Sequence, residues 1–202
     1  MLDFLMQIDR ELFLILNGLN HPWLDPVMYY ISQKFIWIPF YALLLYFTIR
    51  YYGWKTLIIV VLIALLITLS DQISGFIKDA TQRFRPSRDS TLEELVHVVY
   101  NKRGGRFGFV SSHASNSFAL AIFITYLFKN HLKYIGPIMI IWALAKSYSR
   151  IYLGVHYPGD VIGGILLGIL CALLVIEIWK FILRRFYPEQ KIGIEQQTPD
   201  GL

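Results

Sequence analysis

Three residues with complementary chemistry, Arg150, His156 and Asp160, lie between two long apolar runs of this sequence. Ionisable groups next to segments hydrophobic enough to cross a membrane cost free energy, and for that reason they often mark functional sites. An aspartate can accept the Nδ1–H of a histidine and leave Nε2 free as a nucleophile or base, while an arginine fork suits phosphate oxygens. The alternative interpretation is a buried ion pair that fixes a loop between two helices.

A second segment carries two cations, Lys78 and Arg85, followed by Pro86. The two cations are seven residues apart, nearly two helical turns, so they would share one face if the helix continues that far. Pro86 disfavours helix at the preceding residue, and the helix is therefore expected to end at about Arg85. Two cations on one line suit a phosphate, although lysine and arginine also extend from the membrane boundary toward water without any binding role.

A third segment, Gly108–Asn116, contains Ser111, Ser112 and His113 at the point where a loop leads into an apolar run. The N-terminus of a helix offers unpaired N–H groups and a favourable field for an anion, and either serine could cap that helix. His113 would then lie in the first turn beside the anion. The alternative is a serine cap with a histidine at a polar helix end.

Taken in order, Lys-x6-Arg-Pro, Ser-x-His and Ser-Arg-x5-His-x3-Asp resemble the three-part signature of the type 2 phosphatidic acid phosphatase superfamily. The members of that superfamily include bacterial lipid phosphate phosphatases and soluble vanadium haloperoxidases. The resemblance covers Lys78 to Asp160. Two positions of the middle motif differ, because Val110 and Ser112 stand where the family commonly has proline and glycine.

The resemblance implies a two-step phosphoryl transfer through a phosphohistidine. No step of this reaction needs a metal ion, and no cofactor is expected. His156 would attack phosphorus, Asp160 would hold its ring, and His113 would protonate the leaving oxygen and then activate water. Fixed positive charge and hydroxyl groups would bind the phosphate oxygens. These phosphate-binding residues are Lys78, Arg85, Ser111, Ser112 and Arg150. The five histidines also show no metal-ligand spacing such as i, i+4 on a helix, so the sequence predicts no metal site.

The elements that position these residues are expected to be membrane helices. The chain has 202 residues, of which 55% are hydrophobic and 16% charged, and its mean hydropathy is +0.49. These values predict an all-α, polytopic transmembrane helix bundle. The hydrophobic pattern indicates about five spans and one N-terminal amphipathic helix, six helices in total. The expected segments are 2–16 for the amphipathic helix and 27–50, 56–78, 115–128, 134–153 and 161–181 for the spans.

The chain is expected to form one membrane-embedded phosphatase domain, residues 1–187, followed by a flexible polar cytoplasmic tail, residues 188–202. Within the domain, Gln33-Lys34 and Pro39 interrupt the first span, which predicts a kink there. Gly163, Gly164 and Gly168 favour close helix packing in the last span.

Charge sets the expected orientation. Basic residues in 50–55, 129–133 and 184–185 fall on one side of the bundle, which the positive-inside tendency assigns to the cytoplasm. Residues 80–110 then form an extracytoplasmic active-site loop, and the site faces outward from the cytoplasmic (inner) membrane of a bacterium. The net charge of +5 includes no basic arm or basic helix, so membrane lipids and an anionic substrate are expected as partners and nucleic acid is not.

The resemblance implies a lipid phosphate or diphosphate as substrate. The candidates are an undecaprenyl diphosphate-like lipid, phosphatidylglycerophosphate, phosphatidic acid and a lipid A phosphate. The loop Ser90–Phe107 is expected to cap the site, and its basic residues favour a diphosphate; its apolar residues could equally form a small helix that packs on the bundle.

A membrane transporter or proton relay is the alternative function, because intramembrane His, Asp and Arg residues also mark transport pathways. That alternative predicts charges spread through the bilayer and broken helices in paired repeats. Here the charges gather at one end and no repeat is evident, which favours the phosphatase. Lys34, Asp71 and Lys146 are the ionisable residues that neither interpretation assigns.

Overall fold

The computed structural model describes residues 2–92 and 94–187, and most of these residues are helical. The predicted all-α class is confirmed, because the described residues contain no strand beyond the single bridge between Phe84 and Phe107. The α-helices are α1 (Leu2–Gly18), α2 (Leu24–Ser32), α3 (Ile38–Tyr52), α4 (Thr56–Thr81), α5 (Ser112–Phe128), α6 (Ile135–Tyr152) and α7 (Pro158–Phe186). Short 3-10 helices occupy Phe35–Trp37, Gly53–Lys55, Pro86–Arg88 and Val99–Asn101. The predicted tail, 188–202, lies outside the described residues.

The predicted first span, 27–50, contains two helices. Gln33 ends α2 in an extended conformation, with φ −76° and ψ 148°, and helical structure resumes after Lys34. Pro39 occupies the first turn of α3, where an N–H group would have no partner within the helix. The interruption therefore lies where the sequence predicts it. With α2 and α3 counted as one interrupted segment, the described helices make up the six predicted segments.

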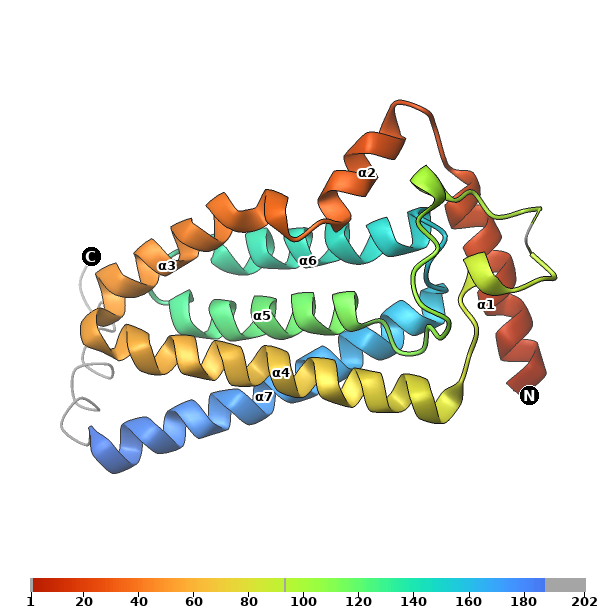
Figure 1. Cartoon of the computed structure of the whole chain (residues 1–202). Coiled ribbons are helices and arrows are strands. Elements are labelled where there is room, and N and C mark those ends of the chain that lie inside the picture. The colour runs from red at the N-terminus through yellow and green to blue at the C-terminus, as the bar shows by residue number, and fades with distance from the viewer. Residues whose placement is uncertain (1, 93, 188–202) are drawn as a thin grey trace, which may run out of the picture.

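Helices α3 to α7 run side by side along the long dimension of the molecule, and α5 lies at their centre (Figure 1). Helix α5 contacts α4, α6 and α7. Its apolar residues surround the whole helix, and most of its side chains are buried, as expected for a helix at the centre of a bundle. The first turn of α5 is therefore held firmly at one end of the bundle.

Two glycines of α7 permit its close crossing with α5. A Cβ atom on Gly168 would lie 2.3 Å from the carbonyl oxygen of Ser115, and one on Gly164 would lie 2.5 Å from the carbonyl oxygen of Ser111. Real side chains do not approach backbone atoms so closely, so each position requires glycine. This crossing fixes the start of α7 against the start of α5.

The outer surface of the bundle is apolar. Two described stretches, Phe35–Thr81 and Pro158–Phe186, are long and apolar enough to cross a membrane. Large apolar side chains point outward from them, including Leu57, Val61, Phe76, Leu166, Leu170 and Leu174. Such a surface suits lipid better than water. The number of spans, about five, stays a prediction.

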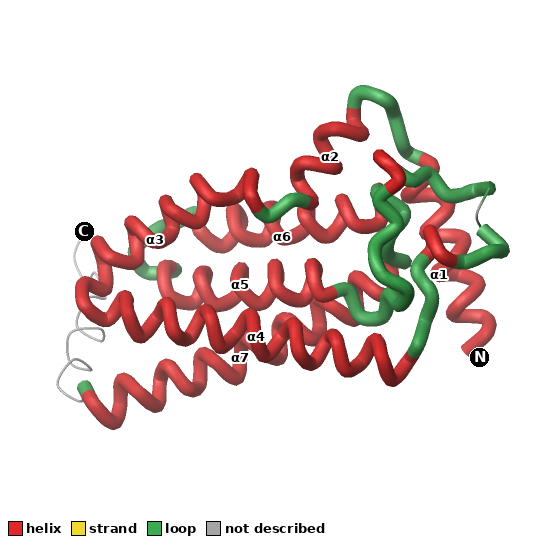
Figure 2. Tube along the Cα trace, in the orientation of Figure 1, coloured by secondary structure: helices red, strands yellow, loops and turns green. Residues whose placement is uncertain are grey.

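The loops that carry the candidate residues gather at one end of the bundle, beside α1 (Figure 2). Helix α4 ends at Thr81 because Gln82 adopts a left-handed conformation, with φ +48°. The expectation that the helix continues to about Arg85 is therefore wrong, and Arg85 belongs to an extended segment. It reaches the site through the course of the loop instead of through a shared helix face.

Helix α1 lies across this end of the bundle and anchors the loop 82–111 (Figure 1). The Asn17 side chain is buried; its Nδ2 donates to the carbonyl oxygens of His97, Ile151 and Tyr152, at 3.1, 3.2 and 2.8 Å. Its Oδ1 accepts from the backbone N–H of His97 at 2.8 Å. One amide side chain thus joins α1, the loop and the end of α6.

Candidate active site

His156 and Asp160 form a buried pair where α7 begins. Pro158 starts the helix, which places His156 just before it and Asp160 in its first turn. The Nδ1 atom of His156 lies 3.2 Å from Oδ2 of Asp160, and the same oxygen accepts the backbone N–H of Tyr157 at 3.1 Å. Both side chains are at most 1% exposed. When Nδ1 carries the proton and faces Asp160, the lone pair of Nε2 points away from the aspartate.

Asp160 has a second partner, Arg83, that the sequence analysis did not assign to the site. Nη1 of Arg83 lies 2.9 Å from Oδ1 of Asp160, and Nη2 lies 2.6 Å from Oδ2 of Asp9 in α1. The other oxygen of Asp9 accepts the backbone N–H of Gly159 at 2.6 Å. Asp9 and Arg83 therefore orient the start of α7. The sequence does not distinguish Asp9 from the other carboxylates of this amphipathic helix, Asp3 and Glu11, and it indicates no partner for any of them.

Arg85 and Arg150 bring positive charge to His156. Nη1 of Arg85 lies 3.2 Å from Nε2 of His156, and its Nε donates to the carbonyl oxygen of Phe107 at 2.9 Å. Arg150 is 4% exposed, and its Nη1 donates to the hydroxyl of Ser32. Its Nε is buried without a hydrogen-bond partner in the described structure. Both guanidinium groups therefore face the histidine with donor capacity left.

Lys78 and Ser112 meet on the side of the site formed by α4 and α5. The Lys78 ammonium donates to the Ser112 hydroxyl at 2.5 Å, and that hydroxyl also lies 2.6 Å from the hydroxyl of Ser74. Ser111 has a different geometry, since its hydroxyl accepts the backbone N–H of Ala114 at 3.4 Å and caps α5. Its own N–H donates to the carbonyl oxygen of Asp160 at 2.8 Å, which joins the start of α5 to the start of α7.

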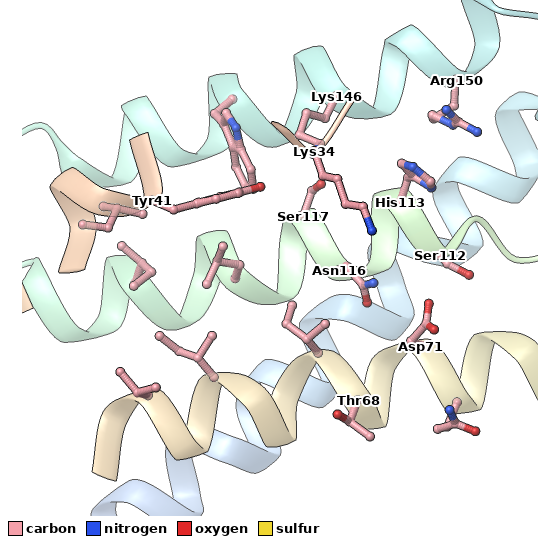
Figure 3. Close-up of a pocket in the computed structure, with 18 of the residues that line it drawn as sticks. Lys34, Tyr41, Thr68, Asp71, Ser112, His113, Asn116, Ser117, Lys146 and Arg150 are labelled. Atoms are coloured by element: carbon pink, nitrogen blue, oxygen red, sulfur yellow. The ribbon is translucent and has the colours of Figure 1, made fainter. Parts of the chain in front are cut away.

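A cavity of about 870 Å³ opens between α3, α4, α5 and α6 beside these residues. Five predicted site residues line one end of it: Arg85, Ser112, His113, Arg150 and His156. Figure 3 shows the His113 and Arg150 side chains next to each other at this end. The other end is largely apolar and includes Tyr41, Leu44, Leu120, Ile124 and Trp142. The cavity can therefore hold a molecule with an anionic head and an apolar portion.

The loop Ser90–Phe107 packs beside the end of the bundle without forming the wall of this cavity. Its buried apolar residues, Leu92 and Val99, pack against α1 and the α6–α7 connection, in turns and one short 3-10 helix. Arg106 stacks over Phe84 and Phe107, at 5.2 and 5.3 Å from the ring centroids. Within the described part of the loop, no residue lines the cavity. The charge of one basic residue of the loop, Lys102, nevertheless acts on Arg150 and His113 at the end of the cavity.

The surroundings of His156 favour the neutral ring. Burial lowers the pKa of His156 well below its usual value of 6.5, and the positive charges of Arg85, Arg150 and Lys78 lower it further. A neutral imidazole with a proton on Nδ1 has a lone pair on Nε2 for a nucleophilic attack. Among residues 2–92 and 94–187, no three His, Cys, Asp or Glu side chains group in a way that could hold a metal ion. Positive charge at this site comes from arginine and lysine.

Comparisons with known proteins agree with this arrangement. Residues 56–184 match the family model of the PAP2 superfamily. The chain is 43% identical over 171 residues to a lipid A 4'-phosphatase of Bacteroides thetaiotaomicron, covering 83% of this chain and 75% of the relative. It is 31% identical to an undecaprenyl-diphosphatase of Sulfolobus acidocaldarius, covering 83% and 77%. The crystal structure of a transmembrane PAP2 type phosphatidylglycerolphosphate phosphatase from Bacillus subtilis superposes with a TM-score of 0.68 at 26% identity, covering 90% of this chain and 89% of that one.

Proposed function

Because this chain belongs to the PAP2 superfamily, we propose that it is an integral-membrane lipid phosphatase that acts through a phosphohistidine on His156. The observation that carries the proposal is the position of the His156 ring, which lies between Asp160 at Nδ1 and Arg85 at Nε2. An imidazole oriented by a carboxylate and faced by a guanidinium group suits nucleophilic attack on a bound phosphate.

In the first step, Nε2 of His156 attacks phosphorus and the bond from phosphorus to the lipid oxygen breaks. The ring becomes positively charged, and Asp160 stabilises that charge through its contact with Nδ1. His113, whose side chain is exposed to the cavity, donates a proton to the lipid oxygen as it leaves. The products of this step are the dephosphorylated lipid and phosphohistidine.

In the second step, water attacks the phosphorus of the phosphohistidine. His113 is now neutral and takes a proton from that water, while the bond from phosphorus to Nε2 breaks and inorganic phosphate forms. One histidine thus acts first as acid and then as base, and the enzyme returns to its starting state.

Charge on the phosphate oxygens is neutralised by groups that the fold already holds in place. Arg85 and Arg150 face His156, and the Lys78 ammonium reaches the site through Ser112. Preorganised donors of this kind lower the barrier because they need little rearrangement in the transition state. Ser111 contributes by capping α5 and by its backbone contact with Asp160.

For the substrate, we propose a phosphorylated glycolipid of the lipid A class. The Bacteroides thetaiotaomicron relative supports this choice by its name and by its high identity over most of the chain. The apolar end of the cavity would accept part of an acyl chain, while the head group lies beside His156. Undecaprenyl diphosphate, phosphatidylglycerophosphate and phosphatidic acid are the comparison substrates.

The proposed placement of the protein in the membrane rests on its apolar helices and on the charged residues at the two ends of the bundle. Residues 1–187 would form one membrane domain in which α3 to α7 cross the bilayer. The basic residues of 50–55, 129–133 and 184–185 lie at the end of the bundle opposite the site (Figure 1), which supports an outward-facing site in the cytoplasmic membrane of a bacterium.

The test is phosphate release by the purified full chain in detergent micelles, measured with the four lipids as substrates. We expect the highest kcat/KM with lipid A 4'-phosphate, and a transient acid-labile phosphoprotein after rapid quenching. His156→Ala should release no phosphate and form no phosphoprotein. His131→Ala is the matched control, because this ring packs on Tyr51 at the far end of the bundle. Phosphate release by His156→Ala at the rate of the unsubstituted protein would exclude the proposed nucleophile.

A further inference from the structure

Three ionisable residues without an assigned role line one part of the active-site cavity. Lys34 follows α2, Asp71 lies in α4 and Lys146 lies in α6, and all three line the cavity together with His113 and Arg150. Figure 3 shows the Lys34 side chain extending into the cavity, with Asp71 on the opposite wall. The two lysines and one aspartate leave an excess of one positive charge there.

The polar groups in this part of the cavity have unused binding capacity. Lys146 is 6% exposed, and the contact that its ammonium makes within the described structure is with the Trp142 ring, 5.4 Å from the centroid. No ion pair involves Lys146 or Lys34 in residues 2–92 and 94–187. The amide oxygen of Asn116 is buried and also lacks a hydrogen-bond partner; because it is an acceptor, it suits an ammonium group or a hydroxyl of the substrate and not a phosphoryl oxygen. Buried polar groups without partners are costly, so their retention points to a ligand.

These residues lie deeper in the cavity than the His156 site. Lys146 precedes Arg150 by four residues on α6, and Asn116 follows His113 by three residues on α5. Helices α5 and α6 run in opposite directions, so Lys146 and Asn116 are displaced from Arg150 and His113 in the same direction along the bundle. Each displacement is about 5 Å, or one helical turn. The apolar lining begins beyond this point. A substrate would therefore meet the His156 site, then the lysines, and then the apolar end.

We propose that Lys34 and Lys146 form a second anion subsite, which binds a second phosphoryl group of the same lipid substrate. The inference rests on the proposed function and specifies the substrate class further. Excess positive charge favours a phosphoryl group over a neutral sugar. Two sources share this chemistry: the inner phosphate of a lipid diphosphate, and the distal phosphate of a glycolipid with two phosphates.

The test compares substrates that differ by one phosphoryl group. One pair is farnesyl diphosphate and farnesyl monophosphate, and the other is lipid A 1,4'-bisphosphate and lipid A 4'-monophosphate. The quantity is the ratio of kcat/KM for the doubly phosphorylated member to that for the singly phosphorylated member. Since both values come from one preparation, the ratio does not depend on the fraction of folded protein.

Lys146→Met and Lys34→Met are each expected to lower this ratio at least about tenfold, equivalent to about 1.4 kcal/mol. Lys146→Arg, which keeps the charge, should recover part of the ratio. Lys133→Met is the matched control, because Lys133 is an exposed lysine that lies over the Tyr134 ring outside the cavity. If Lys146→Met does not fold, the test relies on Lys34→Met, since Lys34 is an exposed position.

If the kcat/KM ratio decreases for the farnesyl pair alone, the ligand of the subsite is the inner phosphate of a diphosphate. If the ratio decreases for the lipid A pair alone, the ligand is the distal phosphate of the glycolipid. Unchanged ratios in both pairs for Lys34→Met and for any folded Lys146→Met protein would overturn the second subsite while leaving the phosphatase intact. If the unsubstituted protein releases phosphate from none of the lipids, the proposed function itself fails.

Discussion

Arg83 binds Asp160 at 2.9 Å through one nitrogen of its guanidinium group, and through the other it binds Asp9 at 2.6 Å. The carboxylate that orients His156 is thus linked to α1, a helix that lies outside the three sequence motifs. Asp160 is fully buried, so Arg83 supplies the charge that balances it. Arg83 is therefore expected to be a positioning residue for the proposed nucleophile.

Arg83→Gln should lower kcat roughly 10- to 100-fold with a smaller change in KM, the range seen when the outer partners of an oriented histidine are removed. The acidic limb of the pH profile of this variant should also shift, because Asp160 loses the positive charge of Arg83. Steady-state kinetics and pH profiles check both points. Arg88→Gln is the matched control, since Arg88 donates to the carbonyl oxygen of Gly104 and is exposed. Equal effects of the two substitutions would contradict the positioning role.

Removal of divalent metal should leave turnover unchanged. Fixed cations at Arg85, Arg150 and Lys78 would neutralise the phosphate, so the proposed mechanism assigns no step to a metal ion. The measurement is phosphate release after dialysis against excess EDTA, compared with release after readdition of Mg²⁺, Mn²⁺ or Zn²⁺. Complete loss of activity that one of these ions restores would refute the metal-free mechanism.

The lowered pKa of His156 predicts the pH dependence of activity. Burial and nearby positive charges lower the pKa of His156 well below 6.5 in the folded protein, so the acidic limb of kcat/KM due to this residue should lie below pH 6.5. His113 must be protonated to act as the acid, which gives a bell-shaped profile. Initial rates between pH 4 and pH 9 test this expectation. An acidic limb above pH 6.5 would contradict it.

The same shift predicts how stability depends on pH. An imidazole in the unfolded chain takes up a proton near pH 6.5, whereas buried His156 does so only at lower pH, so the unfolded state binds more protons below pH 6.5. Stability should therefore fall as the pH falls below about 6.5. In detergent, the Tm difference between pH 7.5 and pH 5 should be smaller for His156→Gln. An equal difference in both proteins would speak against the buried, neutral histidine.

Gly168→Ala should destabilise the bundle by about 1–3 kcal/mol, because the added methyl group overpacks the crossing of α5 and α7. Its Cβ would lie 2.3 Å from the carbonyl oxygen of Ser115. Gly75→Ala is the matched control in α4, where a Cβ would have no atom within 4 Å and alanine favours the helix. Thermal unfolding in detergent should give a lower Tm for the first variant only; a similar Tm for both would argue against the close crossing.

Local sequence determined the helical architecture and the three segments that carry the candidate site residues. Ser111, Pro158 and the apolar runs are local signals, so the boundaries of α4, α5, α6 and α7 lie within five residues of the predicted ones. The spacing of His156 and Asp160 also determines their contact, because a helix start brings residues four apart together. The family resemblance depends on the same local patterns.

Only the tertiary structure decided which distant side chains meet. Asp9 and Arg83 are 74 residues apart, and Arg83 and Asp160 are 77 apart. Neither pairing has a periodicity that a sequence can show. The first depends on how α1 crosses the end of the bundle, and the second depends on how the segment after α4 meets the start of α7. Lys34 and Lys146 share the cavity for the same reason: helix packing, set by the summed burial of many apolar side chains, fixes which faces oppose each other.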